Sequence, residues 1–165
     1  MAFRIRRVGH LVLRVKDAAR SRRFFEEIMA LPVVGQNERG MVFFSADVKD
    51  NHHMLAITPA GEGAAMPARD QVGMEHVSFE LGSFAELQEA YRRLKHNGVE
   101  IDRTTYHGVT KSVYFRDPDG NRLEFYVNVP EEEYRKSAPN PYSRYGGIED
   151  ELDGKIPQKE GTVAP

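Results

Sequence analysis

The chain contains no cysteine among its 165 residues. Without thiols it forms neither disulfide bonds nor a thiolate metal site, so any metal ion must be held by histidine, aspartate or glutamate. An excess of charge of one sign is also missing. The formal net charge of -2 gives no electrostatic reason to expect nucleic acid or an acidic membrane surface as the partner. We therefore expect neither of these partners.

Long apolar runs are absent as well. No segment approaches the roughly 18 consecutive apolar residues that span a bilayer. The opening segment MAFRIRRVGH lacks the apolar stretch and the small-residue cleavage site of a signal peptide, so we expect a cytoplasmic protein. With 165 residues, of which 40% are hydrophobic, the chain suits one ordinary globular domain and is too short for two independent cores of normal size.

An internal repeat organises most of the chain. Residues 9–15 (GHLVLRV) have a counterpart in residues 75–81 (EHVSFEL). Each segment reads as a strand that opens with a histidine, His10 in the first and His76 in the second. The order of elements that follows is the same in both halves.

A helix follows each of these strands. Asp17 is a candidate N-cap for the first helix, which ends near Leu31. Ser83, with Glu86 three residues later, has the spacing of a capping box, and this second helix ends at Gly98. Short β-rich runs come next, at residues 41–46, 53–58, 112–115 and 122–127. Two βαβββ units are the simplest interpretation.

A segment rich in glycine, alanine and proline joins the two units. We place the first module at about 7–59, the linker at 60–73 and the second module at about 74–128, all within a single domain of residues 1–130. Residues 131–165 are charged, rich in proline and glycine, and without a sustained apolar period, so we expect an extended tail. The side chains that would let this tail wrap over the domain or a neighbouring subunit are Tyr134, Tyr142, Tyr145 and Ile148.

The alternation of side chains along a strand predicts which residues share a face. In residues 76–81 the apolar side chains should pack on the helix, which leaves His76 on the opposite face. By the same parity His10, Tyr114 and Glu124 also face away from the helices. A curved mixed sheet with its helices outside, an α+β architecture, would gather these four side chains in one concave cup.

Two histidines and one carboxylate that converge in such a cup match the facial triad that binds Fe(II) and leaves coordination positions open. We therefore predict His10, His76 and Glu124 as the metal ligands. Two neutral imidazoles and one carboxylate leave the bound ion with a net positive charge, which attracts a catecholate anion. Mn(II) suits the same three ligands.

These features resemble the vicinal oxygen chelate superfamily, whose members are built from paired βαβββ units. Residues 107–110 (HGVT) and 113–124 (VYFRDPDGNRLE) are similar to the signature of type I extradiol ring-cleaving dioxygenases. This resemblance implies an enzyme that opens a catechol-like ring with O2 at a mononuclear Fe(II). It also implies that His107 lies near the substrate, that Tyr114 hydrogen-bonds a substrate oxygen and that Glu124 binds the iron.

The same resemblance implies an acid–base histidine on the strand before the linker, where His53 stands. Strand parity places the adjacent His52 on the opposite face. We choose His53 because it shares a face with Leu55, the position that the internal repeat pairs with Glu124. No carboxylate or amide is available on this strand as a fourth ligand, which favours an open, three-ligand site.

Two other functions use the same fold. A metal-dependent isomerase, epimerase or lyase of the glyoxalase kind should need a fourth ligand and prefer Zn, Ni, Co or Mn. A non-catalytic protein that holds a small molecule in the cup would ordinarily lack the complete ligand set. Taken alone, Glu124 also fits an exposed strand carboxylate paired with Arg122 or Arg14. Exposed sheet edges further favour a homo-oligomer.

Overall fold

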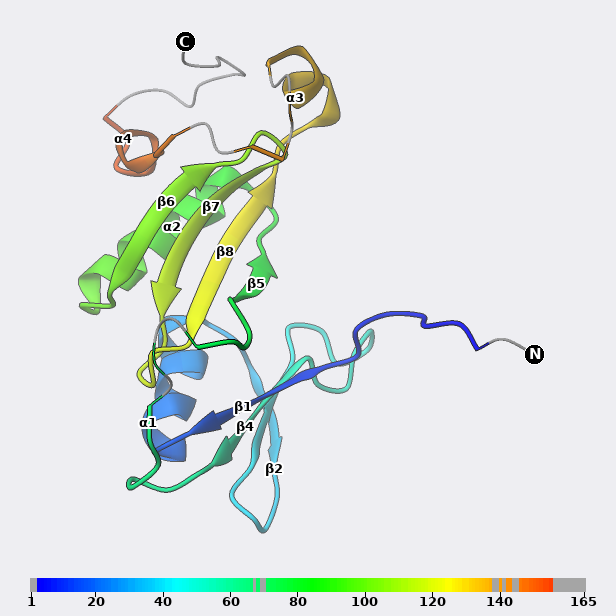
Figure 1. Ribbon diagram of the computed structural model, residues 1–165, viewed down its shortest axis with the longest axis vertical. Coiled ribbons are helices and arrows are strands. Elements are labelled where there is room, and N and C mark those ends of the chain that lie inside the picture. The colour runs from blue at the N-terminus through cyan, green and yellow to red at the C-terminus, as the bar shows by residue number, and fades with distance from the viewer. Residues whose placement is uncertain are drawn as a thin grey trace. The chain divides into compact units, whose positions relative to one another are not determined.

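The computed structural model describes residues 3–66, 68, 71–137, 140, 142–143 and 146–155. Contacts divide the chain into two compact units, residues 1–67 and residues 68–165. Each unit contains one four-stranded mixed sheet with its own helices (Figure 1). The predicted α+β class with paired βαβββ modules is therefore confirmed, and the unit boundary falls inside the predicted linker. The packing of both modules into a single domain stays a prediction.

The sheet of the first unit has the strand order β1-β4-β3-β2. Its strands are β1 (Leu11–Val15), β2 (Val33–Gln36), β3 (Val42–Phe44) and β4 (Leu55–Pro59). The strands β1 and β4 run parallel, whereas the other pairs are antiparallel. Phe25, Phe44, Leu55 and Ile57 are fully buried and form the core of this unit.

The helix α1 (Ala18–Arg23) begins where the sequence predicts. The carboxylate of Asp17 accepts hydrogen bonds from the backbone amides of Ala19 and Arg20, which satisfies two otherwise unpaired donors of the first turn. The helix continues as one π-helical turn, η1 (Phe24–Ile28). The side chains of Phe24 and Phe25 in this turn are buried in the first unit.

The sheet of the second unit has the equivalent order β5-β8-β7-β6. Its strands are β5 (Val77–Glu80), β6 (Ile101–Tyr106), β7 (Thr110–Arg116) and β8 (Arg122–Asn128). Leu123, Phe125 and Val127 are buried on the face that packs on the helix. Because side chains alternate along a strand, Glu124 and Tyr126 lie on the other face. This second face, the open face of the sheet, carries the candidate site.

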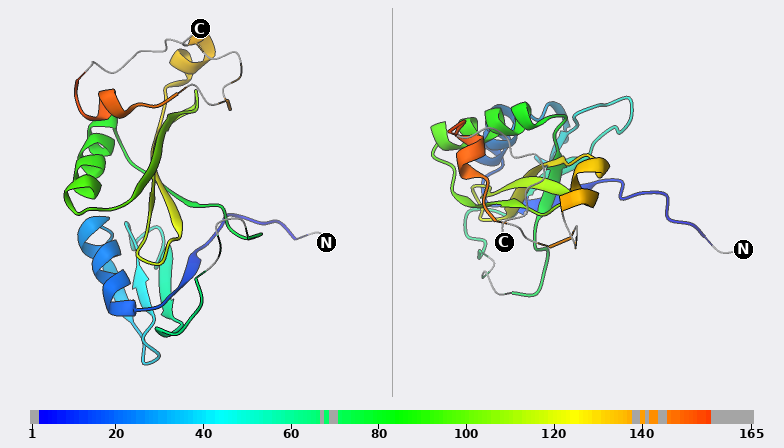
Figure 2. Two further views of the ribbon diagram at one scale, coloured as in Figure 1. Left: turned by 60° about the vertical axis from the view of Figure 1, so that its left-hand side comes forward. Right: turned by 90° about the horizontal axis from the view of Figure 1, so that it is seen from above.

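The helix α2 (Phe84–His96) lies along one side of this sheet (Figures 1 and 2). Ser83 accepts a hydrogen bond from the Glu86 amide, and the Glu86 carboxylate accepts one from the Gly82 amide. This reciprocal capping confirms the predicted start. The helix ends before Gly98, whose φ of 65° lies in the left-handed region that favours glycine. Its buried face consists of Leu87, Tyr91 and Leu94.

The structure contains two strands, β2 and β6, that are not predicted from the sequence. In β6 the residues Ile101 to Tyr106 are largely polar, and a register shift between Ile101 and Arg103 breaks the alternation. A bulge of this kind hides the period of two on which strand prediction depends.

The segment that was expected to be an extended tail contains two short helices, α3 (Glu131–Ser137) and α4 (Glu149–Leu152). Ile148 and Leu152 are buried, and their spacing of four residues places both on one helical face. The Tyr106 amide donates to the Gly146 carbonyl, which fastens this segment to the end of β6. Tyr145 and residues 156–165 of the predicted tail lie outside the described residues. None of the described helices is long and apolar enough to cross a membrane.

Candidate functional site

The open face of the second sheet brings together predicted residues from distant parts of the chain. Strands β7 and β8 place Tyr114 directly opposite Glu124, and the parallel pairing of β5 with β8 places Ser78 on the other side of Glu124. His76 immediately precedes β5, and its Nε2 atom lies 3.3 Å from Oε2 of Glu124. His107 Nε2 lies 3.1 Å from the Tyr114 hydroxyl. The second unit thus gathers all four of its predicted site residues.

The Glu124 carboxylate is buried, with 8% of its side chain exposed. The Ser78 hydroxyl donates a hydrogen bond to it. Arg122 instead bonds Asp102, at 2.8 Å, and Glu75. The alternative interpretation of Glu124 as an exposed carboxylate paired with Arg122 is therefore wrong.

A divalent cation fits this arrangement of donors. Within the described part of the chain, the His76 imidazole is the basic side chain beside the Glu124 carboxylate, and no lysine or arginine forms an ion pair with this carboxylate. Burial of a carboxylate without a compensating cation is costly, so a bound metal ion would stabilise it. His76 Nδ1 is buried and has no hydrogen-bond partner among the described residues, so no neighbour there fixes its tautomer. Imidazole nitrogen with carboxylate oxygen is a donor set that Fe(II) and Mn(II) accept.

Tyr114 lies under the site with only 3% of its surface exposed. Burial raises the pKa of its phenol, and the hydrogen bond and negative charge of Glu124 raise this pKa further, whereas Arg103 opposes the shift. The Arg103 guanidinium lies 4.4 Å from the centre of the Tyr114 ring. A raised pKa keeps the hydroxyl protonated at neutral pH, so Tyr114 can donate a hydrogen bond to a negatively charged oxygen.

A charged network borders the site on the same sheet. Asp102 accepts hydrogen bonds from Arg116 and Arg122, with nitrogen–oxygen distances of 2.8 to 3.0 Å. Burial alone would raise the pKa of Asp102, but the hydrogen bonds and charges of Arg122 and Arg116 outweigh it and hold this pKa below its ordinary value. Both guanidinium groups are therefore paired with carboxylates other than Glu124. The basic neighbour of Glu124 is His76 instead.

The loop that carries His107 is held by its backbone. The His107 amide donates to the Thr110 carbonyl at 2.8 Å, and the Val129 amide donates to the Val109 carbonyl at 2.8 Å. Gly108 has a φ of 84°, a conformation that residues with a side chain rarely adopt. This glycine permits the tight turn that directs the His107 ring towards Tyr114.

A pocket of about 410 Å³ opens beside these residues. This volume lies within the usual range for small-molecule sites. It contains three predicted site residues, Glu124, Tyr114 and His107. Among the described residues, the lining consists of Ser78, His107, Val109, Thr110, Tyr114, Glu124, Tyr126, Asn128 and Tyr142.

The first unit holds a cluster of three histidines. The ring centres of His10 and His53 are 4.5 Å apart, and the Nδ1 atoms of His52 and His53 are 2.6 Å apart. Burial lowers the pKa of His53, and the nearby charges of His10 and His52 lower it further. The prediction that His52 points to the opposite face is wrong, because both residues precede β4 in a bend where strand alternation does not apply.

The register of the two sheets also corrects the matching of the two repeats. Leu11 pairs with Leu55, and in the second unit Val77 pairs with Leu123. The counterpart of Glu124 is therefore Ala56, and the match to Leu55 was shifted by one residue. Alanine has no donor atom in its side chain, so the inference that β4 supplies no fourth ligand is unchanged.

The predicted third ligand, His10, belongs to the first unit, whereas His76 and Glu124 belong to the second. Among the described residues, no group of three or more histidine, aspartate or glutamate side chains is arranged so that it could hold a metal ion. The part played by His10 as a metal ligand stays a prediction, as do the roles of His53, His107 and Tyr114.

Two side chains that bear on the site were not assigned a role from the sequence. Ser78 lies two residues after His76 and therefore shares its face by strand parity, but a serine carries no signal of its own. Arg103 was missed because β6 itself was not named. A search for polar residues opposite Tyr114 in the sheet would have found it.

The family model described as "Glyoxalase/Bleomycin resistance protein/Dioxygenase superfamily" matches residues 7–125. The chain is 32% identical to "Biphenyl-2,3-diol 1,2-dioxygenase 3" of Rhodococcus globerulus, over 95% of this chain and 87% of that protein. It is 27% identical to "Catechol-2,3-dioxygenase" of Bacillus subtilis (strain 168), over 82% of this chain but only 46% of that protein.

Solved structures show the same fold. The crystal structure of the genomically encoded fosfomycin resistance protein FosX from Listeria monocytogenes matches with a TM-score of 0.63. The match covers 81% of this chain and 99% of that one, at 23% sequence identity. At such low identity the likeness concerns the fold alone.

Proposed function

The chain belongs to the Glyoxalase/Bleomycin resistance protein/Dioxygenase superfamily, and on that basis we propose that it is an extradiol dioxygenase, which opens a catechol-type ring with O2 at a mononuclear non-haem Fe(II). The observation that carries the proposal is the meeting of His76 and Glu124 at 3.3 Å beside Tyr114. Similarity to two diol dioxygenases over most of this chain supports it.

In this proposal His76 and Glu124 hold the ion together with His10, and Mn(II) is the alternative ion. When bound, the divalent ion lowers the pKa of the diol hydroxyls and provides the positions at which diol and O2 come together. Ala56 is the counterpart of Glu124 in the first repeat, and its side chain has no donor atom that could act as a fourth ligand. A site with open positions suits a two-substrate reaction better than a fully coordinated one.

Tyr114 and His107 orient the substrate in this proposal. The Tyr114 phenol is protonated at neutral pH because its pKa is raised. Its hydroxyl donates a hydrogen bond to the ionised substrate oxygen, and such a bond to a developing charge favours the reaction. Nε2 of His107 lies 3.1 Å from that hydroxyl, and this hydrogen bond orients the hydroxyl.

His53 is the proposed acid–base residue. Burial and the neighbouring histidines lower its pKa, so its imidazole is neutral at pH 7 and able to accept a proton. The Nδ1 atom contacts His52 at 2.6 Å. In the proposed tautomer Nδ1 of His53 carries the hydrogen and donates it to His52, which leaves Nε2 as the atom at which His53 would take a proton from the substrate and return it later.

The test combines anaerobic loading of the protein with Fe(II) and a panel of catechols. We expect each turned-over diol to consume one O2 and give a yellow ring-opened product, followed by an oxygen electrode and by absorbance. Turnover without O2 uptake, or a protein purified with a stoichiometric Zn or Ni ion and inert to diols, would favour a glyoxalase-like isomerase or lyase. Stoichiometric binding of a small molecule without metal would favour a binding protein.

A further inference from the structure

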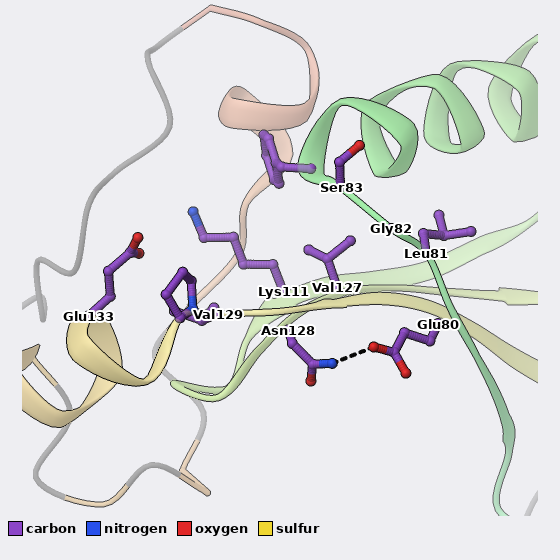
Figure 3. Close-up of a pocket in the computed structure, with 11 residues that line it drawn as sticks. Glu80, Leu81, Gly82, Ser83, Lys111, Val127, Asn128, Val129 and Glu133 are labelled. Atoms are coloured by element: carbon purple, nitrogen blue, oxygen red, sulfur yellow. Dashed lines mark hydrogen bonds between the residues drawn. The ribbon is translucent and has the colours of Figure 1, made fainter.

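The pocket continues along β8 beyond Glu124 and ends at a polar wall. Tyr126 and Asn128 line this end of the pocket, and they follow Glu124 on the same face of the strand. Across the sheet, Glu80 of β5 pairs in register with Tyr126. Figure 3 draws a neighbouring pocket that also contains Asn128, and it shows the Glu80 carboxylate directed at the amide of Asn128. We call Glu80, Tyr126 and Asn128 the acceptor wall.

The hydrogen bonds within the acceptor wall use two of its three donor hydrogens. The Tyr126 hydroxyl donates to Oε2 of Glu80 at 3.3 Å, and Nδ2 of Asn128 donates to Oε1 of Glu80 at 2.5 Å. A phenol has one hydrogen to donate, and an ionised carboxylate has none. The groups left for a ligand are the second N–H of Asn128 and a larger set of acceptors: the Tyr126 oxygen, the Asn128 carbonyl oxygen and the Glu80 carboxylate.

The charges of the pocket have the same sign as this wall. Glu124 is a lining residue and Glu80 adjoins the lining, whereas no lysine or arginine is among the described residues that line the pocket. Oε2 of Glu80 lies 3.3 Å from the hydroxyl of Tyr126, which lines the pocket, so the negative charge of Glu80 acts on the lining. A metal ion on Glu124 would balance that charge and leave the charge of Glu80 uncompensated.

Given the proposed function, on which this inference rests, we propose that the acceptor wall selects a catechol whose side chain carries a protonated amine. An ammonium group is a donor without acceptors and carries the complementary charge. A carboxylate at this position would meet the like charge of Glu80 and find few donors to offset it. An unsubstituted aryl group would leave the acceptors without partners, which weakens binding.

The first experiment compares kcat/KM of the Fe(II)-loaded protein for three catechols of similar size: dopamine, 4-ethylcatechol and 3,4-dihydroxyphenylacetate. We expect dopamine to be preferred and the carboxylate to be the poorest. Glu80→Gln keeps an acceptor but removes the charge, and should lower the ratio of dopamine to 4-ethylcatechol by about two- to fivefold, the range of partly exposed ion pairs. Glu89→Gln, an exposed carboxylate of α2 paired with Arg92, is the matched control and should keep the wild-type ratio.

A binding measurement separates this inference from the proposed function. Calorimetry on the metal-loaded protein compares tyramine with 4-hydroxyphenylacetate, which are monophenols that need no ring opening. A preference for tyramine that Glu80→Gln weakens supports the acceptor wall, even when no diol is turned over. Equal effects of Glu80→Gln on the binding of both ligands would overturn the role of the acceptor wall. A preference of the wild-type protein for the carboxylate ligand would overturn it too, and would assign the selection to Arg103 beside Tyr114.

Discussion

Nε2 of His76 and a carboxylate oxygen of Glu124 stand 3.3 Å apart because the residue before β5 is brought to the middle of β8 by parallel strand pairing. The buried carboxylate is next to a neutral donor, Ser78, and a protonated phenol, Tyr114. This environment favours a cation at the carboxylate, and the consequences for metal binding can be measured residue by residue.

Glu124→Gln should weaken Fe(II) binding by at least about 100-fold, because the amide replaces the one anionic ligand with a neutral group of the same shape. The measurement is an anaerobic Fe(II) titration together with metal analysis. The matched control is Glu75→Gln, since Glu75 is next to His76 but its side chain is 72% exposed. Equal losses in both variants would show a general charge effect rather than a ligand at position 124.

His10→Ala should weaken Fe(II) binding about as much as His76→Ala, if both histidines are ligands of one ion. His96→Ala provides the control, because His96 is the exposed last residue of α2. The same anaerobic titration measures all three variants. Wild-type affinity in His10→Ala, with the His76→Ala affinity strongly reduced, would contradict the proposed ligand set.

Ser78→Ala should lower metal affinity by about tenfold, the size expected when a hydrogen bond that orients a ligand is lost. The Ser78 hydroxyl donates to the Glu124 carboxylate, and its removal lets the carboxylate turn. Ser78→Thr keeps the hydroxyl and should restore most of the affinity. Equal affinity of the alanine and threonine variants would mean that this hydrogen bond does not position Glu124.

Tyr114→Phe should lower kcat for a catechol by about 10- to 1000-fold while Fe(II) affinity is nearly kept, because the lost hydroxyl acts on developing charge at the substrate. Steady-state O2 uptake and Fe(II) titration give the two quantities. Tyr91→Phe, on the buried face of α2, is the control for loss of a tyrosine hydroxyl elsewhere. A larger effect on KM than on kcat would assign Tyr114 to substrate binding alone.

Asp102→Asn should destabilise the protein at neutral pH and much less in acid. The pKa of Asp102 is held below its ordinary value of about 3.9. Its charged form therefore stabilises the folded state above that pH, and this contribution disappears as the pH falls through the lowered pKa. We expect a loss of about 1 to 3 kcal/mol in the free energy of unfolding at pH 7. Urea unfolding of wild type and variant at pH 7 and in acid measures the difference.

The control for that experiment is Asp50→Asn. Asp50 pairs with Arg7 on the surface, with 76% of its side chain exposed, and such pairs contribute at most about 1 kcal/mol. A destabilisation by Asp102→Asn that does not diminish in acid would show that the lost carboxylate charge is not its cause.

The elements that the sequence predicts well are those whose signals are local. Asp17 and Ser83 each cap a helix through contacts within a few residues of the chain. The turn from Asp117 to Gly120 closes with a 3.0 Å backbone hydrogen bond, and Gly120 has a φ of 79°, as a hairpin of this composition requires. Such features need no knowledge of the rest of the fold.

Strand alternation worked where the strand was regular. It placed Tyr114 and Glu124 on one face, and the register of β7 and β8 confirms that they are neighbours. It failed for His52 because residues that bend before a strand do not alternate. It also missed the bulged β6, so Arg103 was not seen beside Tyr114.

The contacts of the last described segment were not foreseeable from pattern alone. Lys111 and Glu151 form a buried ion pair at 2.7 Å, although both residue types are usually exposed. Such a pair exists only because α4 meets the start of β7, and a linear sequence does not state which charges will meet. Of the side chains expected to let this segment dock, Ile148 is buried, as is Leu152, whereas Tyr142 is exposed.

The parallel pairing of β5 with β8 also affects how the site comes into being during folding. Between these two neighbouring strands the chain forms α2, β6 and β7. Because β5 and β8 are so far apart in the sequence, they pair late in folding. Closing a long loop is entropically unfavourable before other contacts exist. His76 and Glu124 therefore become neighbours only once most of the second unit has assembled. An ion that requires both will select fully folded molecules, and the holoprotein will resist unfolding in proportion to the logarithm of free metal concentration.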